Sequence, residues 1–149
     1  MEALYDYAVS RGVRVEFRQD IDPRHPGYYC HETRTIELLD GMNRVKTRSV
    51  LAHELGHATY GHEPSILEHL NLKQERHADE WAAQFLIDPD EYRLAEEKYG
   101  TNTAWIGQEL EVLERLVIAY ERLLHRIGDS VYVRPRMGAK QWAMKLEVA

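Results

Sequence analysis

Disulfides, long apolar runs and an excess of basic charge are all missing from this sequence of 149 residues. A single cysteine, Cys30, excludes an internal disulfide. No apolar run approaches the roughly 20 residues that a membrane-spanning helix needs. The net charge of -6 disfavours binding to nucleic-acid phosphates. Because the first residues, MEALYDYAVSRG, lack the basic start and apolar stretch of a secretion signal, we expect a cytoplasmic protein with no membrane partner.

What the sequence does contain is a globular composition and clustered histidines. Hydrophobic residues make up 44% and charged residues 30%, which is typical of a domain that buries a core. Six of the eight histidines lie between His25 and His69. Such clustering favours a metal site, although solvent-exposed histidines would give the same pattern.

The order of expected elements is a helix, a small sheet and then further helices. A short helix over residues 2–10 precedes an alternating strand at 13–17. The runs YYCHE and TRTIELL, with a polar turn between them, predict a hairpin. A long helix is expected from about Asn43 through His62. The sequence therefore predicts an α+β fold, with a small antiparallel or mixed sheet and a mainly helical, zincin-like body.

The character of the sequence changes after Gly128, so we expect one domain over residues 1–128 and a tail over residues 129–149. The tail is expected to be extended or to bind a partner. Its basic side chains would favour local contact with nucleic acid, and its large apolar side chains would pack or form an interaction surface. These residues are Arg134, Arg136, Met137, Lys140, Trp142, Met144 and Lys145.

The stretch VLAHELGHATYGH, residues 50–62, contains the motif His-Glu-x-x-His. His53 and His57 share one face of a helix, so both imidazoles can reach one Zn²⁺ ion. Glu54 is too close to His53 along the chain to bind in the same way, but it is well placed to take a proton from water. Gly56 would let another segment approach this helix closely.

A third ligand is needed, and His62 is the nearest candidate. It lies one residue short of the metzincin spacing, which requires glycine at position 60 and histidine at position 63, where this sequence has Tyr60 and Glu63. That register turns His62 away from the metal face. We therefore interpret it as a histidine favoured by the dipole at the helix C-terminus.

The competing candidate lies in QERHADEWAAQFL, residues 74–86. Glu75 on a second helix would complete a His₂Glu site between the two helices, and the small Ala78 would permit close packing. Asp79 would orient a ligand histidine by accepting its other ring N–H. His77 points to a different face and is expected to be solvated. A solvent-exposed Glu75 is the alternative, but the first motif favours ligation.

LAHELGHATYGH and ERHADEWAAQFLIDP together resemble the ImmA/IrrE family of metallopeptidases. The family pattern is aHElGHa followed by E-x-x-A-[ND]-x-F-A-x-x-L-L-x-P. This chain departs from it at Trp81, where phenylalanine is usual, and at Ile87, where a second leucine is common. The resemblance is specific over residues 50–89 and loose elsewhere between residues 30 and 127.

The resemblance implies a gluzincin-like site. In it Glu54 is the catalytic acid and base, and the ligands of Zn²⁺, or alternatively of Mn²⁺, are His53, His57 and Glu75. Proteolytic members of the family cleave a helix-turn-helix transcriptional repressor, often encoded next door in phages and mobile elements. The implied partner is therefore such a repressor.

A donor to the carbonyl oxyanion is also required, and Tyr60 is our candidate for it because it lies seven residues after His53 on the same helical face. Tyr28, Tyr29 and His31 are further candidates, and simple packing would explain each of them as well.

The run TRTIELL, residues 33–39, would either offer a sheet edge to an extended peptide or serve as scaffold. Cys30 is interpreted as a buried structural cysteine.

Two functions fit these residues. The first is a zinc endopeptidase that acts on a repressor. The second is a regulatory module that keeps the metal fold and binds a repressor or DNA through the helices of residues 101–127 without cutting. Glu54 favours the first, because a purely structural zinc needs no base.

Overall fold

The computed structural model describes residues 1–124, 130–132 and 145–147. The chain divides into two compact units, Met1–Ala82 and Ala83–Ala149. The expected domain boundary near residue 128 falls outside the described residues and stays a prediction. So do the expectations for the tail residues Arg134, Arg136, Met137, Lys140, Trp142 and Met144.

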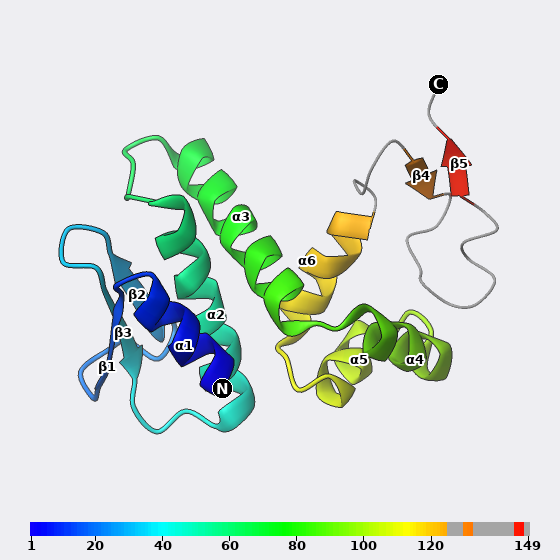
Figure 1. The fold of residues 1–149 in the computed structure, drawn as a ribbon, viewed down its shortest axis with the longest axis horizontal. Coiled ribbons are helices and arrows are strands. Elements are labelled where there is room, and N and C mark those ends of the chain that lie inside the picture. Colours follow the sequence, from blue (N-terminus) through cyan, green and yellow to red (C-terminus); the bar gives the residue numbers. More distant parts are fainter. Residues whose placement is uncertain (125–129, 133–144, 148–149) are drawn as a thin grey trace. The chain divides into compact units, whose positions relative to one another are not determined.

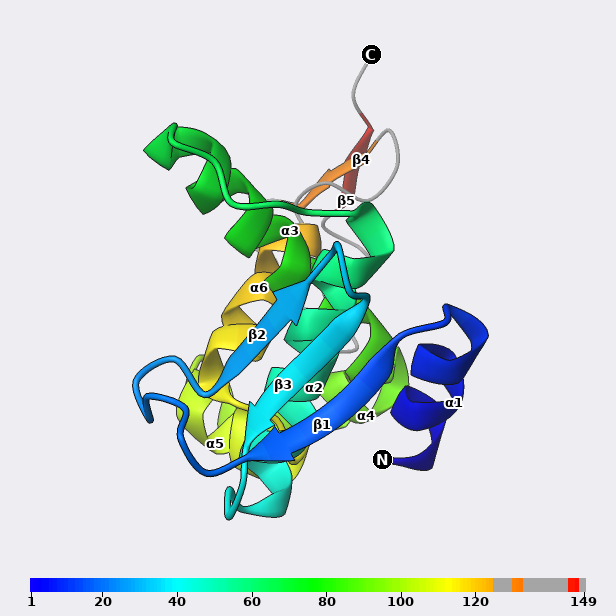
Figure 2. The same ribbon diagram turned by 90° about the vertical axis from the view of Figure 1, so that its left-hand side faces the viewer.

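A three-stranded mixed sheet forms one side of the first unit (Figure 2). Its strands are β1 (Arg14–Arg18), β2 (Gly27–Cys30) and β3 (Thr35–Leu39), in the order β1-β3-β2. Strand β3 pairs antiparallel with β2, which confirms the hairpin, and parallel with β1. The suggestion that residues 33–39 present a sheet edge is wrong, because β3 is hydrogen-bonded on both sides. The edges of this sheet are β1 and β2.

Because successive side chains of a strand point to opposite faces of the sheet, the apolar ones gather on one buried face. Ile36 and Leu38 of β3 are both 0% exposed, and Leu38 lies opposite Gly27 of β2. The other face carries charge, including an ion pair between Arg18 and Glu37 at 3.3 Å. Helix α2 (Arg44–Tyr60) covers the buried face, behind the sheet in Figure 2.

The first unit also contains α1 (Glu2–Ser10) and most of α3 (Glu68–Leu86), which runs across the unit boundary (Figure 1). Helix α2 begins where the side chain of Asn43 accepts a hydrogen bond from the backbone N–H of Lys46 at 2.9 Å. It ends at Tyr60, because Gly61 adopts the left-handed conformation with φ 63°. The expected extension of this helix to His62 is therefore wrong by two residues.

Three helices make up the described core of the second unit: α4 (Pro89–Tyr99), α5 (Thr103–Glu109) and α6 (Glu114–Leu124). Asp88 caps α4 by accepting from the next backbone N–H groups, as the Asp-Pro sequence predicts. Gly107 allows the turn between α5 and α6, since a Cβ there would lie 2.9 Å from the carbonyl oxygen of Val112. Beyond them, β4 (Ser130–Tyr132) pairs antiparallel with β5 (Lys145–Glu147).

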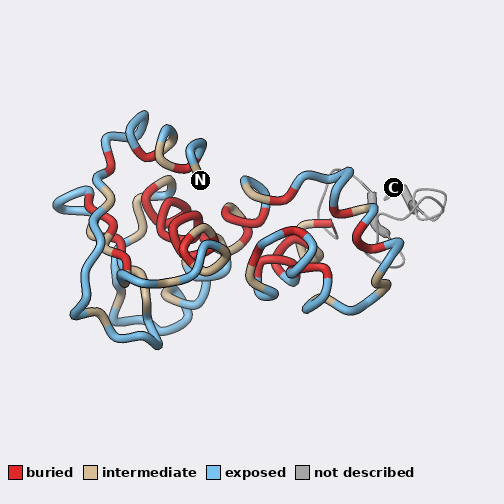
Figure 3. Tube along the Cα trace, turned by 90° about the horizontal axis from the view of Figure 1, so that it is seen from below, coloured by how far each residue is buried: buried red, intermediate tan, exposed pale blue. Residues whose placement is uncertain are grey.

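The α+β class predicted from the sequence is confirmed by these elements. Among the described residues, none of the helices combines the length and the apolar character needed to cross a membrane. Buried residues concentrate along α2, which appears almost continuously buried in Figure 3. That helix carries the candidate site.

Candidate metal centre

The two histidines of the His-Glu-x-x-His motif lie side by side on the buried face of α2. His53 is 4% exposed and His57 is 9% exposed. Their Nε2 atoms are 3.1 Å apart. One helical turn separates the two residues, which is why both rings point to the same place.

Helix α3 reaches this place because two small residues allow a close crossing. A Cβ added to Gly56 of α2 would lie 2.8 Å from both the Cα and the carbonyl oxygen of Ala78 on α3. Ala78 itself is 0% exposed. The backbones can therefore approach closely, and Glu75, which lies three residues before Ala78, is brought to the histidines.

The carboxylate of Glu75 faces both imidazoles. Its Oε2 lies 3.2 Å from Nε2 of His53, and its Oε1 lies 3.2 Å from Nε2 of His57. A tetrahedral ion with bonds of about 2.0–2.1 Å separates its ligand atoms by about 3.3–3.4 Å. The three side chains fit such an ion closely. Within the described residues, they are the one group of three histidine, cysteine or acidic side chains whose ligand atoms lie within 4.8 Å of one another.

Electrostatics favours the form of Glu75 that would bind a metal. Hydrogen bonds from His53 and then from His57 hold the pKa of this carboxyl well below its usual range. Its side chain is 57% exposed, so the site is open to solvent on this side. A charged carboxylate next to two buried imidazoles is the donor set of a His₂Glu metal site.

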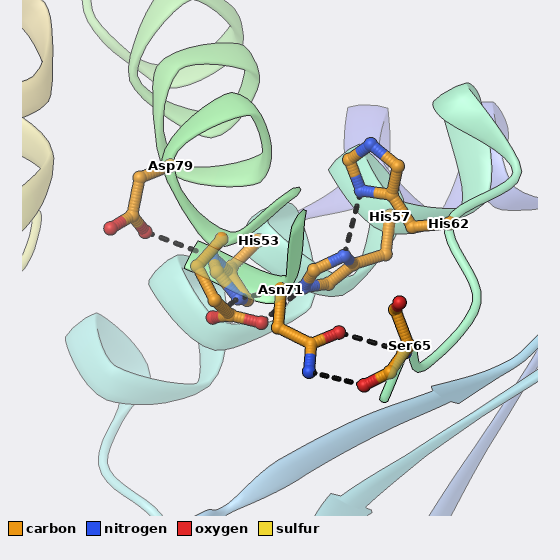
Figure 4. Close-up of polar contacts among 7 residues, drawn as sticks. His53, His57, His62, Ser65, Asn71 and Asp79 are labelled. Atoms are coloured by element: carbon orange, nitrogen blue, oxygen red, sulfur yellow. Dashed lines mark hydrogen bonds and ion pairs between the residues drawn. The ribbon is translucent and has the colours of Figure 1, made fainter. Parts of the chain in front are cut away.

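Asp79 lies one turn beyond Glu75 and contacts the other nitrogen of His53. The distance from its Oδ1 to Nδ1 of His53 is 2.8 Å, and Figure 4 shows the two side chains facing each other. With its hydrogen on Nδ1 and donated to Asp79, His53 has a lone pair on Nε2 for a metal. The sequence predicted this partner, and its role in orienting the ligand stays a prediction.

Glu54, the expected acid and base, is 6% exposed and lies against strand β2. A Cβ added to Gly27 would lie 2.8 Å from Oε1 of Glu54 and 2.5 Å from Cγ1 of Val50. The missing side chain at position 27 therefore makes room for this carboxylate. The sequence did not single out Gly27, although a glycine within a strand often marks a close approach.

His62 is not part of the triad, yet it contacts one of its members. Its Nδ1 lies 2.9 Å from Nδ1 of His57, as Figure 4 shows. The sequence did not predict this contact, because helical geometry was assumed beyond the end of α2. Burial, followed by the neighbouring imidazoles of His57 and His77, lowers the pKa of His62 to about 4.

Tyr60, the candidate oxyanion donor, is 54% exposed and stacks on His62 with ring centroids 5.3 Å apart. His77 is half-buried rather than solvated, and it contacts the rings of both Tyr60 and His62. Tyr60 therefore lies next to the site, and its catalytic role stays a prediction.

The other oxyanion candidates lie on β2 and its turn. Tyr28 is 51% exposed and points to the face opposite Gly27, away from α2. Tyr29 is buried, and its hydroxyl lies 3.2 Å from Nδ1 of His31. Cys30, which we expected to be buried, is half-buried.

One polar contact near the site was not anticipated from the sequence. The side-chain amide of Asn71 accepts from the backbone N–H of Ser65 at 2.8 Å and donates to its carbonyl oxygen at 2.7 Å (Figure 4). Asn71 lies one turn before Glu75 on α3. The contact ties the segment between α2 and α3 to the helix that carries the third member of the triad.

The family to which the chain belongs follows from comparison with known proteins. A model of a peptidase family, described as the IrrE N-terminal-like domain (Peptidase M78), matches residues 10–127. The chain belongs to this family. The resemblance to ImmA/IrrE metallopeptidases that the two sequence segments indicated is thereby confirmed, and the His₂Glu geometry fits a metallopeptidase.

A solved structure has a similar fold. A transcriptional regulator from Mycobacterium tuberculosis is similar, with a TM-score of 0.57 and 15% sequence identity. The match covers 92% of this chain and 44% of the regulator, so the chain spans less than half of that protein's length. At this identity the likeness concerns the fold alone. Comparison with curated proteins gave no match.

Proposed function

We propose that the chain is a zinc-dependent endopeptidase that cleaves a helix-turn-helix transcriptional repressor. The observation that carries this proposal is the meeting of His53, His57 and Glu75 within one small volume, with the buried Glu54 next to His53 in the chain. A structural zinc site commonly uses four protein ligands, whereas three ligands leave a position open for chemistry. The proposed function therefore includes catalysis and not only metal binding.

The residues of the site would have distinct roles in binding the metal and in proton transfer. His53, His57 and Glu75 would hold Zn²⁺, with Mn²⁺ as the alternative. The bound ion would supply Lewis acidity toward water and toward the scissile carbonyl. Glu54 would take the proton of the attacking water and later pass it to the leaving amine. Gly27 makes room for the carboxylate of Glu54.

Two further residues would support the reaction. Asp79, which is 17% exposed, would hold the ring of His53 through its Nδ1 hydrogen. Tyr60 at the end of α2 would donate its hydroxyl hydrogen to the carbonyl oxygen as negative charge develops there. The contact of its ring with His62, at a centroid distance of 5.3 Å, supports this assignment.

The repressor as substrate rests on the family resemblance. The similar Mycobacterium tuberculosis protein carries the name of a transcriptional regulator, which agrees with a role in gene regulation without identifying a target. The substrate to test is therefore any helix-turn-helix protein that is encoded next to this chain.

A cleavage assay with matched variants tests the proposal. The purified, Zn²⁺-loaded chain is incubated with the neighbouring repressor, and the products are followed by gel electrophoresis and mass spectrometry. Glu54→Gln should keep the metal and lose cleavage by a factor of at least about 10². Glu63→Gln, an exposed glutamate between α2 and α3, is the control and should cleave at the wild-type rate.

The same assay separates the two functions considered from the sequence. If the repressor is bound but stays intact with the wild-type chain, the non-cleaving regulatory module is favoured. If Glu54→Gln cleaves as fast as the wild type, Glu54 is not the base and the proposed mechanism is wrong.

A further inference from the structure

The two ligand histidines differ in what contacts their Nδ1 atoms. Nδ1 of His53 lies 2.8 Å from a carboxylate oxygen of Asp79. Nδ1 of His57 lies 2.9 Å from Nδ1 of His62, another imidazole. Figure 4 shows both contacts, on the sides of the rings that face away from the shared Nε2 position. Each ligand therefore has its own polar partner, and the partners differ in charge.

The direction of the His57–His62 hydrogen bond follows from the chemistry of ligation. His57 meets Glu75 and His53 with its Nε2, so a metal bound there would take the Nε2 lone pair. A neutral imidazole then carries its hydrogen on Nδ1. Nδ1 of His62 must accept that hydrogen with its lone pair, which puts the hydrogen of His62 itself on Nε2.

The turn at the end of α2 places His62 for this contact. Gly61 adopts φ 63°, and the backbone N–H of His62 donates back to the carbonyl oxygen of His57 at 3.0 Å. The N–H of Gly61 donates to the carbonyl oxygen of Ala58, which completes the hydrogen-bond pair of a Schellman turn. Because the chain folds back here, the side chain of His62 returns to the ring of His57, with centroids 5.1 Å apart.

The rings of Tyr60 and His77 both lie against the imidazole of His62. Tyr60 stacks on it with ring centroids 5.3 Å apart and an interplanar angle of 25°. His77 of α3 stacks with centroids 6.2 Å apart and an angle of 27°. The ring of His62 thus has fixed neighbours from both helices of the site.

We propose that His62 is a positioning residue that accepts the Nδ1 hydrogen of His57 and thereby fixes the tautomer and the ring orientation of this metal ligand. His62 touches neither the metal nor the substrate. Since a neutral imidazole accepts a hydrogen bond more weakly than a carboxylate does, His57 is expected to be the less basic of the two histidine ligands. The proposal rests on the metal site of the proposed function.

Zn²⁺ affinity measured in competition with a chromophoric chelator tests the role of His62. His62→Phe keeps a ring against Tyr60 and His77 but removes the acceptor, and its Zn²⁺ dissociation constant should rise by about 10-fold to 100-fold. His62→Asn offers an amide oxygen close to the position of Nδ1 and should recover much of the affinity. His77→Phe removes an imidazole from the same stack without touching a ligand, and it should bind Zn²⁺ as the wild type does.

Two results would overturn the role of His62. One is wild-type affinity in His62→Phe. The other is an equal loss in His77→Phe, which would assign the effect to a general disturbance of the ring cluster rather than to the missing hydrogen-bond acceptor at position 62. Thermal unfolding of the metal-free variants shows whether each of them is folded.

Nitrogen-15 NMR of the Zn²⁺-loaded wild type gives a readout that does not depend on any variant. His62 is expected to show a hydrogen on Nε2 and a bare, hydrogen-bonded Nδ1, with the hydrogen of His57 on Nδ1. A hydrogen on Nδ1 of His62 would overturn the proposal.

The failure of this proposal is distinguishable from failure of the proposed function. A wild-type chain that takes up no Zn²⁺ contradicts the metal site, and both proposals fall with it. A wild-type chain that binds Zn²⁺ no better than His62→Phe does leaves the peptidase proposal standing and removes only His62.

Discussion

Buried polar groups in residues 1–82 and in residues 83–124 are satisfied in different ways. In the second unit, Tyr92 is 0% exposed and its hydroxyl donates to Glu121 at 3.1 Å. Burial, and then the charge of Glu121, raises the pKa of Tyr92 far above its usual range, so it remains a donor. The hydroxyl donor meets carboxylate acceptors, and its hydrogen bond to Glu121 links α4 to α6.

In the first unit, three groups with lone pairs converge instead. They are Nε2 of His53, Nε2 of His57 and the carboxylate of Glu75, with separations of 3.1–3.2 Å. If the Nδ1 hydrogens are directed to Asp79 and His62, as binding of a metal at Nε2 requires, positive charge at this place comes from added protons or from a cation. The balance of donors and acceptors therefore separates a polar group that supports the fold from one that can bind a ligand.

Loss of the Glu75 carboxylate should have the largest effect on Zn²⁺ affinity, because it removes one of the three groups that distinguish the first unit from the second. Glu75→Gln is expected to weaken Zn²⁺ binding by more than about 100-fold, since even the loss of an outer-shell partner costs 10-fold to 100-fold. Isothermal titration or chelator competition measures this. Glu68→Gln lies two turns earlier on α3, is exposed, and should bind as the wild type does. Equal affinity in both variants would exclude Glu75 as a ligand.

Crowding of Glu54 should have an intermediate effect and would separate catalysis from metal binding. Gly27→Ala places a methyl group where Glu54 and Val50 now lie, so the carboxylate must shift. We expect peptidase activity to fall on the order of 10-fold to 100-fold, as small misplacements do, with Zn²⁺ affinity retained.

Tyr28→Phe, on the opposite face of the same strand, serves as the control and should keep full activity. A Gly27→Ala variant with unchanged turnover would show that β2 does not confine Glu54. Loss of activity in Tyr28→Phe would instead favour the Tyr28 hydroxyl as an oxyanion donor.

Removal of the Tyr92 hydroxyl should have the smallest effect, and only on stability. Tyr92→Phe leaves Glu121 without this donor and is expected to lower the free energy of unfolding by about 1–2 kcal/mol. Denaturant unfolding measures the change, while Zn²⁺ affinity should be the same as in the wild type. A loss of metal binding in this variant would contradict the division of roles between the two units.

The sequence was sufficient to predict those parts of the fold that local patterns determine. The hairpin of β2 and β3, the capped start of α4 and the α+β class all follow from short-range periodicity and capping residues. The parallel pairing of β1 with β3 did not follow, because it joins strands with another strand between them in the chain. For that reason the sequence could not show that β3 is the central strand.

In the candidate site, too, some residues could be predicted from local patterns and others could not. His53 and His57 follow from helical spacing, and Glu75 was reached through the second motif and the family resemblance. His62 was misjudged because the helical register was extended past Gly61, although a glycine at that position is a common signal for the end of a helix. Gly27 comes from a distant strand, and only the folded structure brings it against Glu54.

Metal analysis of the purified chain tests the central claim most directly. We expect about one equivalent of zinc or manganese per chain in the wild type, and little in His53→Ala, which removes one of three ligands. Less than about half an equivalent in the wild type, with no further loss in His53→Ala, would contradict it.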